Sequence, residues 1–206
     1  MTDHFNLLKQ QIPALEKISD VPGEIGFFAQ EALRFCTIAG TLCATFPLDN
    51  SSIGERQITH ILARSLLENY FWLIYIFDDK SQRNVRYGEK VNGFKREYSK
   101  LIADPLVPKK EELEPADPTW GALPRPMDVN SMLAQVKNDY GDRLSYLYFV
   151  YRVASFDTHG NSMAVLFEQA FGKSCNFSAL NLPFGFDLIA NQYLVILQEL
   201  AKAGEV

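Results

Sequence analysis

Two groups of polar side chains within apolar stretches have residue types and spacings that could do chemistry. The first lies in QITHILARSLLENYFWLIYIF, where His60, Arg64 and Glu68 are spaced four apart, with Ser65 and Asn69 beside them. On a helix, this spacing places the side chains on one face. Because an unpaired buried charge is costly, Arg64 and Glu68 are expected to pair with each other. They form either a structural ion pair on a partly solvated face or a pair that orients a ligand in a cleft.

The second group lies in YLYFVYRVASFDTHGN. Arg152, Ser155 and His159 are spaced three and four apart on one helical face, Asp157 lies off that face, and Asn161 follows the helix end. Arginine, serine and histidine together could bind a phosphate and transfer a proton near neutral pH. The predicted catalytic residues are Arg152 and His159, and the predicted ligand-binding residues are Arg64, Glu68, Ser155 and Asn161.

Helix geometry limits how Arg152 and His159 can cooperate. Seven residues of straight helix rise by about 10 Å, and helical side chains lean toward the N-terminus. The two side chains could share a substrate only if the helix breaks before Gly160 or if a symmetric partner supplies the second residue. In the alternative interpretation, His159 caps the C-terminal carbonyls of its helix and Arg152 forms a salt bridge with Glu68.

An all-helical chain with Arg, a spacer of four to six residues and then His resembles the HEPN superfamily of bacterial defence and toxin proteins. Six residues separate Arg152 from His159. Arg64 and Glu68 resemble accessory polar positions on a neighbouring helix in that superfamily. The segments ARSLLENYFWLIYI and YRVASFDTHGN are also similar to segments of uncharacterised bacterial helical families. The pattern departs from the superfamily at Val153, where a polar residue usually follows the Arg.

The resemblance implies metal-independent cleavage of RNA by a homodimer, in a defence or toxin–antitoxin setting. The 2′-hydroxyl would attack the adjacent phosphate, with His159 transferring protons and Arg152 holding the phosphate across a two-fold axis. Many HEPN-like domains are not catalytic, so the alternative is a helical module that binds a partner protein or a small phosphorylated ligand. No cofactor is implied. The three histidines lack HExxH or carboxylate spacing, so no metal site is predicted.

The elements that must position these residues are helices. Apolar residues recur at helical spacing almost throughout, no alternating strand pattern persists, and neither GxGxxG nor GxxxxGK occurs. Ser51 and Ser52 followed by Glu55 resemble a capping box. We therefore predict an all-α bundle of about six to eight helices in a single domain spanning 1–206. The expected helices cover 5–18 with a break at Pro13, 22–46, 53–78, 80–102, 128–141 capped by Asp128, 142–160 capped by Asp142, 162–171, and 184–202.

A long acidic connection, residues 103–127, holds six of the ten prolines and interrupts the helical pattern. Trp120 and Leu123 are expected to attach it to the body. The helix before it carries seven bases and two acids between Lys80 and Lys100. This basic helix could track a nucleic-acid backbone. In the alternative, its aromatic residues Tyr87, Phe94 and Tyr98 pack on an apolar face and the bases form the solvated side.

Composition excludes several classes of protein. The chain has 206 residues, 25 acids against 20 bases, a net charge of −5 and 47% hydrophobic residues, which argues against disorder. The most apolar stretch, 70–77, is too short to span a membrane, and the first ten residues do not resemble a secretory signal. Three cysteines are too few and too scattered for a disulfide framework. We therefore expect a cytoplasmic protein without membrane contact, and the resemblance implies RNA or protein partners.

Overall fold

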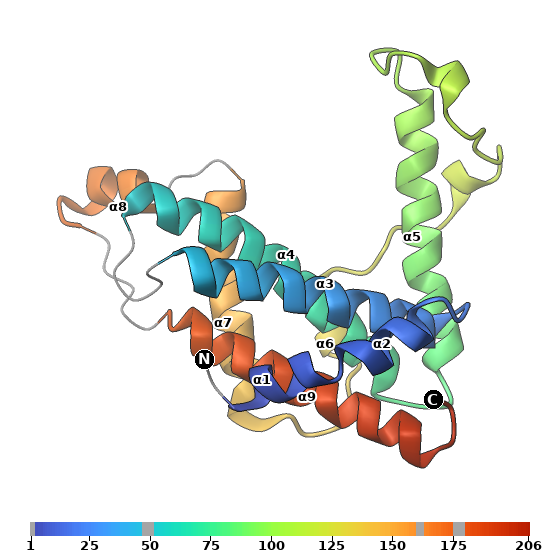
Figure 1. Ribbon diagram of the computed structural model, residues 1–206. Helices are drawn as coiled ribbons and strands as arrows, with labels where there is room; N and C mark the ends of the chain where they lie inside the picture. The colour runs from blue at the N-terminus through green and yellow to red at the C-terminus, as the bar shows by residue number, and fades with distance from the viewer. Residues whose placement is uncertain (1–2, 47–51, 160–162, 175–179) are drawn as a thin grey trace. The chain divides into compact units, whose positions relative to one another are not determined.

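In a computed structural model that describes residues 3–46, 52–159, 163–174 and 180–206, the chain is entirely helical (Figure 1). This confirms the predicted all-α class. Within those residues there is no strand, and no helix is long and apolar enough to cross a membrane. The elements are α1 (Asp3–Gln10), α2 (Ile12–Ser19), α3 (Glu24–Thr45), α4 (Ile53–Phe77), α5 (Arg83–Ala103), the short 3-10 helices η1 (Lys110–Glu112) and η2 (Trp120–Ala122), α6 (Val129–Leu133), α7 (Gly141–Thr158), α8 (Met163–Phe171) and α9 (Leu182–Lys202).

Local signals explain where several helices begin. The first predicted helix breaks at Gln11 rather than at Pro13, which instead lies in the first turn of α2, where its missing N–H costs nothing. Ser52 and Glu55 form the capping box of α4: the Ser52 N–H donates to the Glu55 carboxylate at 2.7 Å, and the Glu55 N–H donates to Ser52 Oγ at 3.3 Å. Asn181 caps α9 by accepting a hydrogen bond from the Phe184 N–H, so this helix begins two residues before the predicted start.

Two predicted boundaries near α6 and α7 are wrong. Asp128 caps α6 by accepting from the Ser131 N–H, but this helix ends at Leu133 rather than at 141. Asp142 is not a cap, because α7 begins at Gly141 and Asp142 lies in its first turn. At the other end, α7 stays helical through Thr158. Gly160, the predicted stop, lies outside the described residues.

The chain divides into two compact units, the first formed by Met1–Tyr70 with Asn138–Val206 and the second by Phe71–Lys137. Phe35 of α3 is the aromatic centre of the first unit. Its ring makes edge-on contacts with Phe5 of α1 and with Phe186 and Tyr193 of α9, at centroid distances of 5.7, 6.1 and 5.3 Å. All four rings are almost fully buried. This aromatic cluster joins helices from the two ends of the chain into one core.

In the second unit, the proline-rich connection runs back along α5 in the opposite direction (Figure 1). Tyr98 contacts the connection at Glu114, Arg96 contacts it at Leu123, and Gly93 faces Pro126. A Cβ on Gly93 would lie 3.1 Å from the Pro126 side chain, so the close approach favours glycine there. Trp120, through its ring, and Leu123, through its main-chain carbonyl, attach the connection to α5.

Candidate functional site between α4 and α7

The polar strip of α4 faces α7. Arg64 donates from Nε to Ser155 Oγ at 3.2 Å, from Nη1 to Glu68 Oε2 at 2.5 Å, and from Nη2 to the Tyr151 hydroxyl at 3.1 Å. Its guanidinium carbon also lies 4.9 Å from the centre of the Tyr151 ring. The predicted pairing of Arg64 with Glu68 is confirmed. Because every nitrogen of this guanidinium already donates to the protein, Arg64 serves to hold α7 against α4.

A second pair, and this one buried, lies on the same side of α4. His60 Nδ1 is 2.6 Å from Asp157 Oδ2, and the two side chains are 5% and 7% exposed. Asp157 Oδ1 accepts a hydrogen bond from the backbone N–H of Met163, the first residue of α8. Burial lowers the pKa of His60, although the hydrogen bond and charge of Asp157 oppose that shift. The neutral imidazole therefore carries its proton on Nδ1, because a carboxylate can only accept.

The pairing of His60 with Asp157 was not predicted from the sequence. The helical spacing indicated only that Asp157 lies off the face that bears Arg152, Ser155 and His159. The signal that could have placed Asp157 on the buried face of α7 is its spacing. It follows the apolar residues Val153 and Ala154 by four and three positions, and both of these are buried. His60 was recognised as part of the α4 strip, but its partner is 97 residues away in sequence. Nothing local to either residue identifies that partner.

The two predicted catalytic residues lie on the exposed side of α7. Arg152 donates to the Tyr148 hydroxyl at 3.3 Å and lies over that ring, and among the described residues it forms no ion pair with Glu68. His159 is exposed and is the C-cap residue, and its backbone N–H donates to the Ser155 carbonyl at 3.3 Å. Since α7 is regular through Thr158, about 10 Å of rise separates the two residues. Asn161 lies outside the described residues.

The structure thus divides the predicted site residues into two sets. Arg64, Glu68 and Ser155 meet between α4 and α7 and satisfy one another. Arg152 and His159 face outward and do not join that cluster. They share their face of α7 with two exposed aromatic residues, Phe149 at 39% and Phe156 at 48%. In chain order, the exposed face of α7 reads Phe149, Arg152, Phe156, His159, with intervals of three, four and three.

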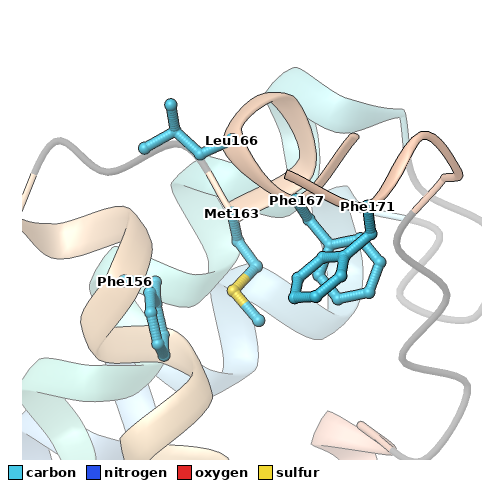
Figure 2. Close-up of a pocket in the computed structure, with 5 residues that line it drawn as sticks. All are labelled: Phe156, Met163, Leu166, Phe167 and Phe171. Carbon is cyan, nitrogen blue, oxygen red and sulfur yellow. The ribbon is translucent and has the colours of Figure 1, made fainter. Parts of the chain in front are cut away.

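Beside this face, α7 and α8 enclose an apolar pocket of about 420 Å³ (Figure 2). Phe156 comes from α7, and the other lining residues come from α8: Met163, Leu166, Phe167 and Phe171. The side chains in Figure 2 carry no nitrogen or oxygen, so the pocket could hold a flat or aliphatic group but could not read its hydrogen-bonding edges. Phe156 and Met163 flank His159 in the chain, which places the pocket next to the end of α7.

Comparison with known proteins finds no protein-family model, curated protein or solved structure that matches this chain. In the described part of the chain, no three side chains of His, Cys, Asp and Glu gather as a metal site would require.

Proposed function

We propose that this protein is a HEPN-like endoribonuclease that works as a homodimer, with Arg152 of one copy and His159 of the other acting on the same phosphate of RNA. The observation that carries the proposal is the exposed face of α7. On it a guanidinium and an imidazole stand about 10 Å apart along the helix, each beside an exposed aromatic ring.

Symmetry brings such residues together. If two copies of α7 pack antiparallel about a two-fold axis near residues 155 and 156, Arg152 of each copy lies opposite His159 of the other. Helices in contact are about 8–10 Å apart, which leaves room for a phosphate between the two side chains. Phe156 would lie near the axis and pack against its own copy, so the 48% of this side chain exposed in one chain would be covered. The cluster around Arg64 would hold α7 in place from behind.

The proposed reaction needs one proton carrier and one fixed charge. The His159 imidazole accepts the proton of the 2′-hydroxyl as the 2′ oxygen bonds to phosphorus. The bond from phosphorus to the 5′ oxygen then breaks, and the imidazolium returns the proton to that leaving oxygen. The products are a 2′,3′-cyclic phosphate and a free 5′-hydroxyl. The Arg152 guanidinium, which no described acid neutralises, stabilises the negative charge that develops on the phosphate oxygens.

The test is cleavage of a labelled RNA by the full chain in the presence of EDTA, with each product end identified. We expect His159→Ala and Arg152→Ala each to lower the rate at least about 100-fold. Ser145→Ala, at another exposed position on α7, is the control and should cleave normally. Full activity of the His159→Ala variant would overturn the proposal.

Mixing the two inactive variants tests the shared site directly. After subunit exchange, half of the dimers would be mixed, and each mixed dimer would hold one site with both residues, so roughly a quarter of the activity should return. No recovery in a mixture shown to exchange subunits would mean that both residues must come from one chain.

A second candidate function is a non-catalytic module that binds a partner protein. The observation in its favour is the apolar pocket of Figure 2, whose residues Leu166 and Phe171 are 51% and 63% exposed. The occupied guanidinium of Arg64 argues against the other alternative, a phosphorylated ligand bound at Arg64 and Glu68. Absence of any RNA cleavage by the purified chain would favour the module.

A further inference from the structure

The second unit carries an exposed group of aromatic rings that contributes little to its core. Phe94 on α5 is 66% exposed, so the interpretation that it packs on an apolar face is wrong. Its ring stacks on Tyr98, one helical turn further on, with centroids 5.8 Å apart and planes at 22°. The Tyr98 ring in turn meets Trp120 of η2 edge-on at 6.3 Å. We call Phe94, Tyr98 and Trp120 the aromatic platform.

The connection holds this platform in a fixed arrangement. The Tyr98 hydroxyl donates to the Glu114 carbonyl at 2.7 Å, which fixes the tilt of the ring. Arg96 Nη1 donates to the Gly121 carbonyl at 3.1 Å and to the Leu123 carbonyl, which fixes the segment that bears Trp120. A ligand that binds to rings already in place loses less conformational entropy than one that must order them.

Cations surround the platform. Lys95 Nζ lies 5.5 Å from the centre of the Trp120 ring. Lys100 pairs with Glu97 at 2.5 Å, and the pKa of Glu97 is lowered by that hydrogen bond and by the nearby charges of Lys100, Arg96 and Arg125. Besides Glu97, the nearby acids are Glu114, whose main-chain carbonyl accepts from Tyr98, and Asp117, which accepts from the backbone and hydroxyl of Thr119. Lys95 therefore lies directly against the platform, and Lys100, Arg96 and Arg125 lie around Glu97, the residue before Tyr98.

Other bases of α5 have structural roles. Arg86 is 5% exposed and bound to carbonyl oxygens, and Lys90 lies over the ring of Trp72 at 4.8 Å. The positive charge of this helix is therefore not one continuous stripe for a nucleic-acid backbone. The part suited to a charged ligand lies next to the platform, where flat apolar surface and cations occur together.

We propose that the aromatic platform binds single-stranded nucleic acid, with a base stacked on the open face of Phe94 and the adjacent phosphates contacted by Lys95, Lys100 and Arg125. Flat rings combined with flexible cations suit a strand whose bases are unpaired, because every base has a face that can stack. No set of donors and acceptors lines the platform to read base edges, so binding should depend little on sequence. The proposal adds an RNA-binding surface to the proposed ribonuclease, and it rests on that function only for the choice of RNA over DNA.

The experiment uses the full chain and two labelled 12-nucleotide probes, oligo(dT) and oligo(U), with the dissociation constant measured by fluorescence anisotropy at low salt. Because oligo(dT) has no 2′-hydroxyl, it cannot be cleaved by the proposed reaction, and its binding is read independently of catalysis. We expect Phe94→Ala to weaken the binding of both probes about tenfold. Val85→Ala is the matched control, since Val85 is an apolar residue on the same helix, 60% exposed and outside the platform.

Two further measurements separate base stacking from non-specific electrostatic attraction. Lys95→Gln should reduce the slope of log affinity against log salt by about one, as expected for the loss of one phosphate contact. Trp120 is half-buried while Trp72, the other tryptophan, is 4% exposed, so quenching by oligo(dT) should be lost in Trp120→Phe. Equal affinities of the Phe94→Ala and Val85→Ala variants, or no binding of either probe, would overturn the proposal. Binding that depends on Phe94 without cleavage of RNA would retain the platform and remove the ribonuclease.

Discussion

Arginines hold together both the contact between α4 and α7 in the first unit and the packing around α5 in the second, but they bind different groups. Arg64 donates only to side chains, those of Ser155, Glu68 and Tyr151. In the second unit Arg86 donates to the carbonyls of Tyr75 and Gln135. Arg96 donates to those of Gly121 and Leu123.

The difference follows from what each arginine packs against. Within a helix such as α7, carbonyl oxygens already accept hydrogen bonds from the following turn, so a neighbouring arginine needs side-chain acceptors. An irregular segment and the last turn of a helix leave carbonyls unpaired, and arginine can satisfy those. A side-chain acceptor one helical turn from an arginine can be recognised in the sequence by its residue type and spacing. A main-chain carbonyl belongs to every residue, so the sequence does not show which one accepts. This explains why the sequence predicted the pairing of Arg64 and missed those of Arg86 and Arg96.

Among the variants that test this comparison, Arg86→Leu should lower the free energy of unfolding the most. The side chains of Arg86 and Asp78 are 6% and 0% exposed, and Arg86 Nη1 lies 3.8 Å from Asp78 Oδ2. The substitution therefore removes a buried cation from beside a buried carboxylate, and it also removes the donor to two main-chain carbonyls. We expect the free energy of unfolding of the second unit to fall by about 3–5 kcal/mol. Both tryptophans, Trp72 and Trp120, lie in this unit, so urea denaturation followed by tryptophan fluorescence measures its unfolding.

The exposed Arg125→Leu is the control for this variant and should change the free energy of unfolding little. An Arg86→Leu variant as stable as that control would mean that neither the ion pair of Arg86 with Asp78 nor its main-chain hydrogen bonds stabilise the second unit.

Asp157→Ala in the first unit should cause the next largest decrease in the free energy of unfolding. The substitution removes the acceptor of both His60 and the Met163 N–H, and we expect a loss of about 2–4 kcal/mol because one buried and one partly buried donor lose their partner. Far-UV circular dichroism during urea denaturation is the measurement. Asp142→Ala, an exposed acid in the first turn of the same helix, is the control.

A double-mutant cycle with His60→Phe should give a coupling energy of about 1–3 kcal/mol with Asp157→Ala. Additive effects would show that the two residues stabilise the fold independently.

The smallest effect is a dependence of stability on pH in the first unit. Burial lowers the pKa of His60 below its ordinary value of 6.5, so as pH falls below 6.5 the unfolded chain takes up a proton before the folded chain does. Stability should therefore decrease as the pH falls from 6.5 toward 5. Thermal denaturation across that range, with His60→Gln as the comparison, measures the effect. The same slope in the His60→Gln variant would assign the pH dependence to another group.

Much of the fold was predictable because helical periodicity and capping are local. Ser52 with Glu55, and Asp128 with Ser131, act within three residues of each other, and both caps were readable from the sequence. The length of α6 was not predictable, because the helical spacing of the sequence continues past Leu133 although the helix ends there. The pairing of Arg64 with Glu68 was predictable for the same reason as the caps: its residues lie one turn apart on one helix.

The sequence by itself determined the helical class and the polar strip of α4, and it placed Arg152 and His159 on one helix. Only the tertiary structure decided that His60 meets Asp157 from 97 residues away, that each guanidinium nitrogen of Arg64 donates to the protein, and that Phe94 is left exposed. The physical reason is the distance along the chain over which each kind of interaction acts. Periodicity, capping and one-turn pairs act within a few residues, whereas burial and distant partners depend on which helices come together.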